Sequence, residues 1–193
     1  MKNDILNQIY NRPETVFTID EIAQLSHNVS NKSLLYSLYY FTKTNQIRRL
    51  HQGIYSKLNY NPFELANKVY KPSYISLETV LFKSGVIFQT YHTIFLTSYL
   101  TRTVSVGQTD LQFRKIKNTV LTNMQGIEQK TGYFWATLER AFLDALYIYK
   151  DYHFDNLEPI DWKKIESLKG IYHSKALEKR VADYYSLYQE EHG

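Results

Sequence analysis

The most constraining feature of the sequence is the order of patterns in its first 60 residues. Apolar residues recur at helical spacing in three stretches, 3–10, 19–25 and 31–45, as expected for amphipathic helices that bury one face. The middle stretch follows Thr18 and has a glutamate three residues after that threonine, which is the pattern of a capping box. A hairpin pattern centred on Gly53 comes directly after the third stretch. We therefore predict three helices, the second one short, followed by a two-stranded hairpin.

The breaks between these helices define the module further. Pro13 closes the first helix, and residues 27–31, HNVSN, are rich in residues that form turns. A short helix, a turn, a longer helix and a basic hairpin follow one another in a winged helix-turn-helix. In that module the short helix braces the longer one, which enters the DNA major groove. The pattern predicts a winged helix-turn-helix DNA-binding domain over residues 1–60.

All the charged side chains between Glu21 and Glu64 have a positive charge. The whole chain has a formal net charge of +4, yet no Asp or Glu lies between Glu21 and Glu64, whereas five Lys and Arg residues do. A one-signed window of this kind favours a polyanionic partner. The charge alone leaves an alternative open, namely a solvated amphipathic helix followed by an ordinary surface hairpin.

The predicted DNA contacts come from the start of the third helix, from its face opposite the leucines, and from the hairpin. Hydroxyl, amine and aromatic groups on that face suit base edges and phosphates, and the helix start adds backbone N–H groups. The hairpin cations are expected beside the DNA backbone or in the minor groove, with His51 either near a phosphate or simply at the surface. The predicted set is Ser30, Asn31, Lys32, Ser33, Tyr36, Ser37, Tyr40, Lys43, Arg48, Arg49, His51 and Lys57. The core-facing side is predicted to hold Leu34, Leu35, Leu38 and Phe41.

The first hairpin strand cannot alternate regularly. Strict alternation would place Arg48 and Leu50 on the same face of the strand. One of these residues is charged and the other apolar, so a bulge or an irregular strand start is expected here.

Residues 61–193 are predicted to form an alpha/beta domain. Two prolines mark a junction over 61–73, and Ser76 is expected to cap a helix that Gly85 ends. Residues 93–135 then alternate in the manner of strands, which favours a mostly antiparallel sheet. The strand-like segments are TIFLTSYL, RTVSVG, LQFRKIK, NTVL, GIEQK and GYFWA.

Helices are expected again after the sheet. The clearest follows Thr137 and has one apolar face, made of Leu138, Ala141, Phe142, Ala145, Leu146 and Tyr149. Two more are predicted over 161–168 and 174–189. The predicted fold class is therefore α+β, with an N-terminal winged helix-turn-helix, an alpha/beta domain with a mostly antiparallel sheet, and C-terminal helices.

Several function classes have no support in the sequence. The chain has no cysteine, its six histidines are scattered, and neither Gly-rich phosphate-binding motif occurs. No apolar run approaches the ~20 residues of a membrane span, and the N-terminus lacks the apolar core of a signal peptide. We expect a cytoplasmic protein without a cofactor, a metal or a membrane partner.

Three segments resemble the AbiEi-type antitoxins of bacterial abortive-infection (type IV) toxin–antitoxin systems. They are IRRLHQGIYS, NPFELANKVYKPSYISLETVLFKSGVI and ATLERAFLDALYI, within a resemblance that spans roughly residues 1–150 and is most specific in PSYISLETVLFKSG. The resemblance implies a winged helix-turn-helix followed by an alpha/beta antitoxin domain. It implies a repressor that binds repeated half-sites in its own promoter, as a monomer or weak dimer. It also implies an antitoxin that counteracts a nucleotidyltransferase-type toxin without a stable complex.

An enzyme and an interaction module are the alternatives. Asp110, Glu128 and Lys130 lie in strand-like segments and Glu78 lies in a preceding helix. These residue types hold Mg²⁺ and orient water in metal-dependent nucleases of the PD-(D/E)xK kind, active or degenerate. A Glu-x-Lys triplet occurs about once by chance in such a chain, so we expect no enzymatic activity. A protein-interaction module that does not bind DNA is the third hypothesis.

Overall fold

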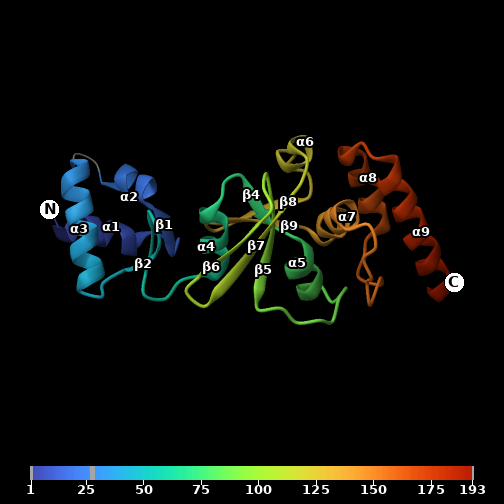
Figure 1. Ribbon diagram of the computed structural model, residues 1–193, viewed down its shortest axis with the longest axis horizontal. Coiled ribbons are helices and arrows are strands. Elements are labelled where there is room, and N and C mark those ends of the chain that lie inside the picture. The colour runs from blue at the N-terminus through green and yellow to red at the C-terminus, as the bar shows by residue number, and fades with distance from the viewer. Residues whose placement is uncertain (1, 27–28, 193) are drawn as a thin grey trace. The chain divides into compact units, whose positions relative to one another are not determined.

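The chain folds into two compact units, which contain both helices and strands and confirm the α+β class (Figure 1). The computed structural model describes residues 2–26 and 29–192. The N-terminal unit comprises Met1–Val69 with Thr131–Tyr133, and the C-terminal unit comprises Tyr70–Lys130 with Phe134–Gly193.

The N-terminal unit contains the three expected helices in the expected order, followed by the hairpin. Its elements are α1 (Lys2–Asn11), β1 (Val16–Thr18), α2 (Ile19–Leu25), α3 (Asn31–Lys43), β2 (Arg48–His51), β3 (Ile54–Ser56) and α4 (Pro62–Val69). Strand β1 is an addition to the prediction, since three residues are too few to show a strand period. It pairs antiparallel with β3, so that the hairpin belongs to a sheet of order β1-β3-β2.

Local signals account for these elements. Both hydrogen bonds of the capping box at the start of α2 are present, from the Glu21 N–H to Thr18 Oγ1 (3.3 Å) and from the Thr18 N–H to Glu21 Oε2 (2.9 Å). Gly53 turns the hairpin with a φ of 71°, in the left-handed region that glycine adopts without a steric cost. The β2–β3 register shifts between Arg49 and His51, which confirms the predicted irregularity. The predicted turn over 27–31 includes residues 27 and 28, which lie outside the described residues.

The core of the N-terminal unit joins α1, α2 and α3 to the sheet. It consists of Ile5, Ile9, Phe17, Ile22, Leu34, Leu38, Phe41, Ile47 and Tyr55. The unit also extends beyond residue 60, the boundary that the sequence suggests. Helix α4 belongs to it because the buried Glu64 carboxylate accepts hydrogen bonds from the backbone N–H groups of Thr15 (2.6 Å) and Val16 (3.0 Å).

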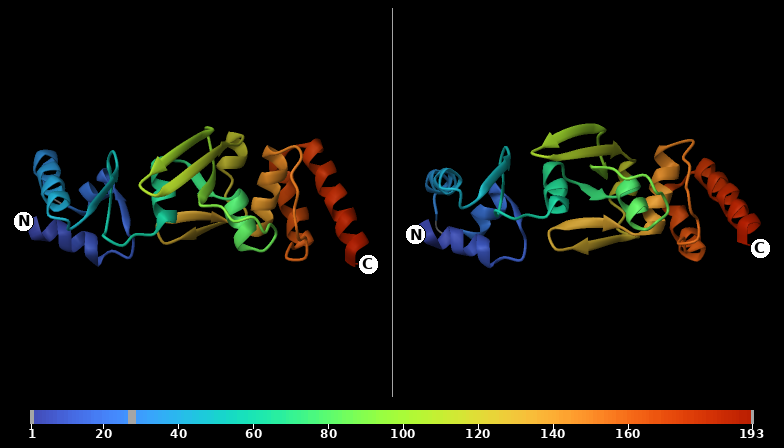
Figure 2. Two further views of the ribbon diagram at one scale, coloured as in Figure 1. Left: turned by 60° about the horizontal axis from the view of Figure 1, so that its bottom comes forward. Right: turned by 90° about the horizontal axis from the view of Figure 1, so that it is seen from below.

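The C-terminal unit is built on a six-stranded sheet of order β6-β7-β5-β4-β9-β8. Figure 2 shows the hairpins β6–β7 and β8–β9 at its two opposite edges. Its strands are β4 (Ser73–Ile75), β5 (Thr93–Ser98), β6 (Arg102–Val106), β7 (Thr109–Lys115), β8 (Ile127–Lys130) and β9 (Tyr133–Ala136). Its helices are α5 (Leu77–Lys83), α6 (Asn118–Leu121), α7 (Leu138–Ile148), α8 (Trp162–Lys169), η1 (Gly170–Tyr172) and α9 (Lys175–His192).

The sheet is mixed: it contains antiparallel pairs, as the sequence predicts, and also parallel pairs, which the sequence does not predict. Strands β4–β5 and β6–β7 pair antiparallel, but β5–β7 and β4–β9 pair parallel. Alternation in a sequence shows which side chains share a face, and it says nothing about strand direction. The segment NTVL, predicted as a strand, forms the short helix α6, and strand β4 was not predicted.

The other helices of this unit are arranged around α7. The predicted cap of α7 is confirmed, because the Arg140 N–H donates a hydrogen bond to Thr137 Oγ1 (3.3 Å). Helix α7 contacts α5, α8 and α9, and Figure 1 shows α8 and α9 on the side of α7 away from the sheet. Helices α8 and α9 agree with the two predicted C-terminal helices. Ser76 precedes α5 as predicted, but its hydroxyl makes no capping bond there and donates to Asp144 Oδ2 (2.7 Å).

Candidate nucleic-acid interface

One stripe of α3, spaced i, i+4, i+7 and i+11, faces away from the core of the N-terminal unit. It consists of Lys32, Tyr36, Tyr39 and Lys43, all of which are exposed, and we refer to these four residues as the outer stripe. Tyr36 and Tyr39 expose 60% and 65% of their surface. The stripe therefore has a cation at each end and two accessible rings between them.

Two side chains of α3 lie elsewhere than predicted. Ser37 is only 4% exposed and its hydroxyl donates to the Ser33 carbonyl (2.9 Å), so it is not on the outer face. Leu35, predicted for the core, is 52% exposed. The helical period explains both differences. The buried face of α3 is centred on Leu34, Leu38 and Phe41; Ser37 lies within that face, and Leu35 lies at the edge of the exposed face. Tyr39, which the prediction omits, lies on the outer stripe.

Helix α3 begins at Asn31, and the Ser30 side chain, predicted as a phosphate contact, is the N-cap of the helix. The Ser30 side chain accepts a hydrogen bond from the Ser33 N–H (3.3 Å) and donates one to the Ser33 hydroxyl (3.0 Å). Asn31 and Lys32 are exposed, and the first turn contains no acidic residue. The partial positive charge of the helix N-terminus is therefore reinforced by a lysine and is not offset by a carboxylate in that turn.

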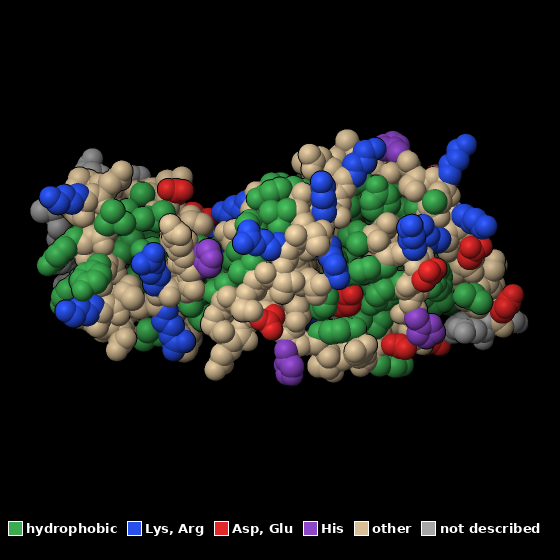
Figure 3. Space-filling view, viewed as in Figure 1, with side chains coloured by type: hydrophobic (Ala, Val, Ile, Leu, Met, Phe, Trp, Pro, Cys, Tyr) green, Lys and Arg blue, Asp and Glu red, His purple; other side chains and the backbone are tan. Residues whose placement is uncertain are grey.

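The hairpin presents the side chains of its first strand to solvent. Arg48, Arg49 and His51 of β2 are exposed, whereas all three residues of β3 are buried. Figure 3 shows Lys and Arg side chains over both α3 and the β2–β3 hairpin on the same face of the N-terminal unit, with hydrophobic side chains among them. The helix and the hairpin thus contribute to one positively charged surface.

Lys57 is predicted to contact a phosphate, but in the structure it binds backbone carbonyls of its own unit. Its ammonium group donates hydrogen bonds to the carbonyl oxygens of Arg12 (2.5 Å) and Tyr10 (3.4 Å), and it lies 5.9 Å from the centre of the Tyr10 ring. These carbonyls lie at and just after the C-terminal end of α1, where a helix leaves acceptors without intrahelical partners. The side chain therefore stabilises the end of α1.

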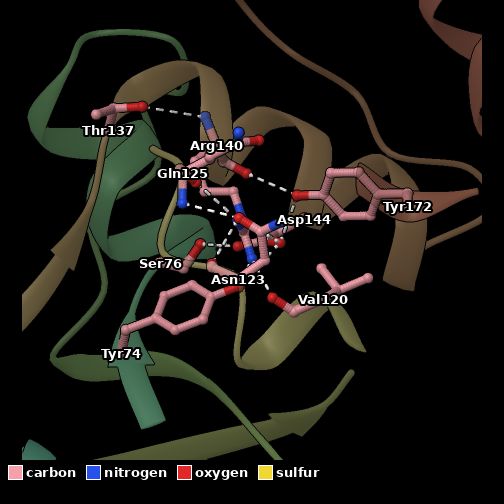
Figure 4. Close-up of polar contacts among 9 residues, drawn as sticks. All are labelled: Tyr74, Ser76, Val120, Asn123, Gln125, Thr137, Arg140, Asp144 and Tyr172. Carbon is pink, nitrogen blue, oxygen red and sulfur yellow. Dashed lines mark hydrogen bonds and ion pairs between the residues drawn. The ribbon is translucent and has the colours of Figure 1, made fainter. Parts of the chain in front are cut away.

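A dense polar cluster lies in the interior of the C-terminal unit and includes the ion pair of Arg140 and Asp144 on α7 (Figure 4). Both side chains are fully buried, and Arg140 Nε lies 3.3 Å from Asp144 Oδ1. The guanidinium donates to Asp144 Oδ1, the Tyr74 hydroxyl, and the carbonyls of Val120, Asn123 and Gln125. All five N–H donors of the arginine are therefore used.

The Asp144 carboxylate is equally well satisfied. It accepts hydrogen bonds from the hydroxyls of Tyr172 (2.7 Å), Ser76 (2.7 Å) and Tyr74 (3.2 Å). Burial raises the pKa of Asp144 by more than the guanidinium and these hydroxyls lower it, so the net shift is upward. Burial is also the largest influence on the pKa of Arg140, which it lowers, but the Asp144 carboxylate and the hydroxyls of Tyr172 and Tyr74 together outweigh it, and that pKa shifts upward. The ion pair and its hydrogen bonds thus offset part of the cost of burying the two charges.

The cluster holds the unit together, and the side chains of Arg140 and Asp144 are closed off from solvent. It connects β4, the segment after α6, α7 and η1, which are far apart in the sequence. Gly126 contributes by close approach, since a Cβ there would lie 2.9 Å from the Cβ of Arg140. The sequence reasoning missed this cluster. Its one signal was an Arg and an Asp at i, i+4 on a helix whose other residues are mostly apolar.

The four residues of the nuclease hypothesis are not brought together. Asp110 on β7 accepts a hydrogen bond from the Ser105 hydroxyl (2.6 Å), whereas Glu128 on β8 pairs with Lys130 at 2.5 Å. Strands β5, β4 and β9 lie between β7 and β8, a separation of roughly 19 Å at the usual strand spacing. Glu78 is buried on α5, and burial raises its pKa. Among residues 2–26 and 29–192, no three His, Asp or Glu side chains are grouped so as to hold a metal ion.

Comparisons of the chain with protein-family models and with curated proteins found no match. None of the helices within the described ranges is long and apolar enough to cross a lipid bilayer. The outer stripe, the start of α3 and the exposed arginines of β2 are therefore the features on which a functional proposal has to rest.

Proposed function

We propose that the protein is a DNA-binding transcriptional repressor that also acts as the antitoxin of an abortive-infection toxin–antitoxin system. In this proposal the N-terminal unit is a winged helix-turn-helix, in which α2 braces α3, α3 enters the major groove and β2–β3 is the wing. One observation carries it: the outer stripe and the exposed arginines lie on a segment that contains no acidic residue between Glu21 and Glu64.

The dimensions of the outer stripe fit this role. Lys32 and Lys43 are spaced i, i+11, which is ~16 Å along the helix axis at 1.5 Å per residue. The major groove is about 12 Å wide, so the two ammonium groups can reach the phosphates that border it. Tyr36 and Tyr39 would then face the base edges. The lysines position α3, and the residues between them read the sequence.

The wing supplies contacts that do not depend on sequence. Arg48 and Arg49 are placed beside the DNA backbone or in the minor groove, where their charges displace condensed counterions. Each phosphate neutralised in this way makes binding more sensitive to salt. The affinity of the protein for duplex DNA should therefore fall steeply as the salt concentration rises.

The antitoxin part of the proposal rests on the resemblance of segments 61–87 and 136–148 to AbiEi-type antitoxins. These segments supply Tyr74, Ser76, Arg140 and Asp144 of the buried cluster. The segments that resemble the antitoxins thus include side chains of the internal scaffold of the C-terminal unit. In the proposed system the protein represses its own operon and counteracts a nucleotidyltransferase-type toxin encoded beside it, without a stable complex.

DNA binding is tested with the full chain and a duplex that covers the region upstream of its own reading frame. The variant Arg48→Ala/Arg49→Ala should bind more weakly on all sequences. The slope of log K against log salt should decrease by about 2, because each phosphate that is no longer neutralised removes ~0.9 from it. The matched control is Lys175→Ala/Lys179→Ala on α9, which removes two exposed cations elsewhere. An arginine variant with unchanged affinity and slope would contradict the wing assignment.

The antitoxin role is tested by co-expression with the adjacent reading frame. If that frame encodes a nucleotidyltransferase that arrests growth, the protein should restore growth, and the two chains should not co-purify. A stable complex with the neighbouring protein, combined with no binding to DNA, would support the interaction-module hypothesis in its place. Failure to restore growth would overturn the antitoxin role and leave the repressor role standing.

A further inference from the structure

The exposed face of α3 has more apolar surface than phosphate binding requires. Leu35 is 52% exposed and lies one turn before Tyr39, and Tyr36 and Tyr40 repeat this spacing one residue later. The four large side chains are therefore contiguous on one face of α3. We refer to Leu35, Tyr36, Tyr39 and Tyr40 as the apolar ridge.

The surroundings of the apolar ridge indicate the kind of partner that covers it. A contiguous exposed apolar patch on a small unit marks an interaction surface. Lys32 and Lys43 lie at the two ends of this ridge, and the surrounding sequence contains no acidic residue. A partner that covers the ridge must therefore be anionic at its borders and offer apolar groups between them.

The DNA major groove has this combination of groups. Phosphates border the groove, and among the base edges thymine alone adds an apolar group, its C5-methyl. A leucine has no hydrogen-bond donor or acceptor in its side chain, so at a base edge a methyl group is its natural contact. An exposed leucine in the first half of α3 therefore favours thymine.

We propose that α3 recognises DNA in part through the C5-methyl groups of thymine, which Leu35 and Tyr39 contact. This inference rests on the proposed function, because it needs α3 in the major groove. It assigns thymine to the half-site positions that face the ridge. The lysines at the two ends of the outer stripe hold the helix in register on the phosphates.

Removal of the methyl groups tests the proposal directly. The duplex from the region upstream of the reading frame is amplified once with dTTP and once with dUTP, which keeps all hydrogen-bonding groups of the bases and removes every C5-methyl. The unmodified protein should bind the uracil duplex more weakly, by about fourfold for each methyl group that the complex buries. The affinities are measured by fluorescence anisotropy at one fixed salt concentration.

Two variants test whether the apolar ridge causes the preference for thymine. Leu35→Ala/Tyr39→Ala should bind the thymine and uracil duplexes equally well, and circular dichroism should show that it is folded. Leu187→Ala on α9 removes a leucine of similar exposure, 48%, and should keep the preference for thymine.

The outcomes separate this inference from the proposed function. Equal binding of both duplexes by the unmodified protein would overturn the thymine contact, while salt-dependent binding through Arg48 and Arg49 would keep the proposed function. A preference that persists in Leu35→Ala/Tyr39→Ala would come from DNA shape and would also overturn it. If that variant changes only the sedimentation of the protein, the ridge joins two copies of the chain, and the inference fails. If the protein binds neither duplex nor any member of a random-sequence pool, both proposals fail.

Discussion

Two regions of this protein use arginine and tyrosine in opposite ways, namely the exposed surface of α3 and β2 in the N-terminal unit and the buried cluster of Arg140 and Asp144 in the C-terminal unit. In the N-terminal unit, Arg48, Arg49 and Tyr39 are exposed. In the C-terminal unit, Arg140 and Tyr172 are buried, and all guanidinium donors are used within the fold. The difference teaches that residue type alone does not identify a binding site. What decides is whether the polar atoms are already committed to partners in the same chain.

Solvation energies explain why a buried arginine needs partners within the chain and an exposed arginine does not. Transfer of an ion from water into a protein interior costs several kcal/mol even after relaxation, so a buried arginine persists only with a carboxylate and a full set of hydrogen bonds. An exposed arginine keeps its water and can exchange that water for a phosphate. The buried cluster is therefore expected to serve stability and the exposed surface to serve the proposed DNA binding, a division that paired substitutions can test.

The largest difference is expected for the same substitution at the two kinds of arginine. Arg140→Ala leaves the Asp144 carboxylate buried without its cation and should lower the free energy of unfolding by about 3–5 kcal/mol. Arg48→Ala should change it by less than about 0.5 kcal/mol, as is usual for exposed positions. Urea denaturation of the full chain measures both. If Arg140→Ala does not accumulate as folded protein, Arg140→Lys, which keeps the charge, should fold with a smaller loss of stability. Equal stabilities of Arg140→Ala and Arg48→Ala would refute the contrast.

Removal of a tyrosine hydroxyl should give an intermediate difference in the free energy of unfolding between the buried and the exposed site. Tyr172→Phe removes the hydroxyl that donates to Asp144 at 2.7 Å and should lower the free energy of unfolding by about 1.5–3 kcal/mol, the range for hydrogen bonds to charged groups. Tyr39→Phe removes an exposed hydroxyl and should leave the stability of the protein nearly unchanged. It also keeps the ring, so the preference for thymine should remain. A stability loss in Tyr39→Phe as large as that in Tyr172→Phe would show that the exposed ring is committed to the fold.

The smallest effect concerns two lysines of the N-terminal unit. Lys57→Met removes the cation that binds the carbonyls at the end of α1 and should lower the free energy of unfolding by about 0.3–1 kcal/mol. The salt dependence of DNA binding should stay as it is in the unmodified protein. Lys32→Met should do the reverse, with unchanged stability and a salt slope reduced by about 0.9. A reduced salt slope in Lys57→Met would return Lys57 to the predicted DNA contacts.

The prediction from sequence succeeded where the signal is local. The capping box of Thr18 and Glu21, the turn at Gly53 and the irregular strand at Arg49 depend on residues close together in the chain. It failed where side chains far apart decide the outcome. Arg140 and Asp144 lie outside the apolar face predicted for their helix, because nothing near them in the sequence shows that Tyr74 and the segment after α6 cover them. The parallel pairs of the sheet were missed because alternation is the same for both strand directions.

The sequence by itself determined the α+β class, the order of helices and hairpin in the N-terminal unit, and the segment without acidic residues. Helical period, capping and turn chemistry act over a few residues, and charge can be counted directly. Only the tertiary structure decided that Ser37 is buried, that Leu35 and Tyr39 are exposed, and that Lys57 is bound to α1. These outcomes depend on which surface each side chain meets in the folded chain. Burial and hydrogen-bond commitment are properties of the packed molecule, and they separate the proposed binding surface from the core.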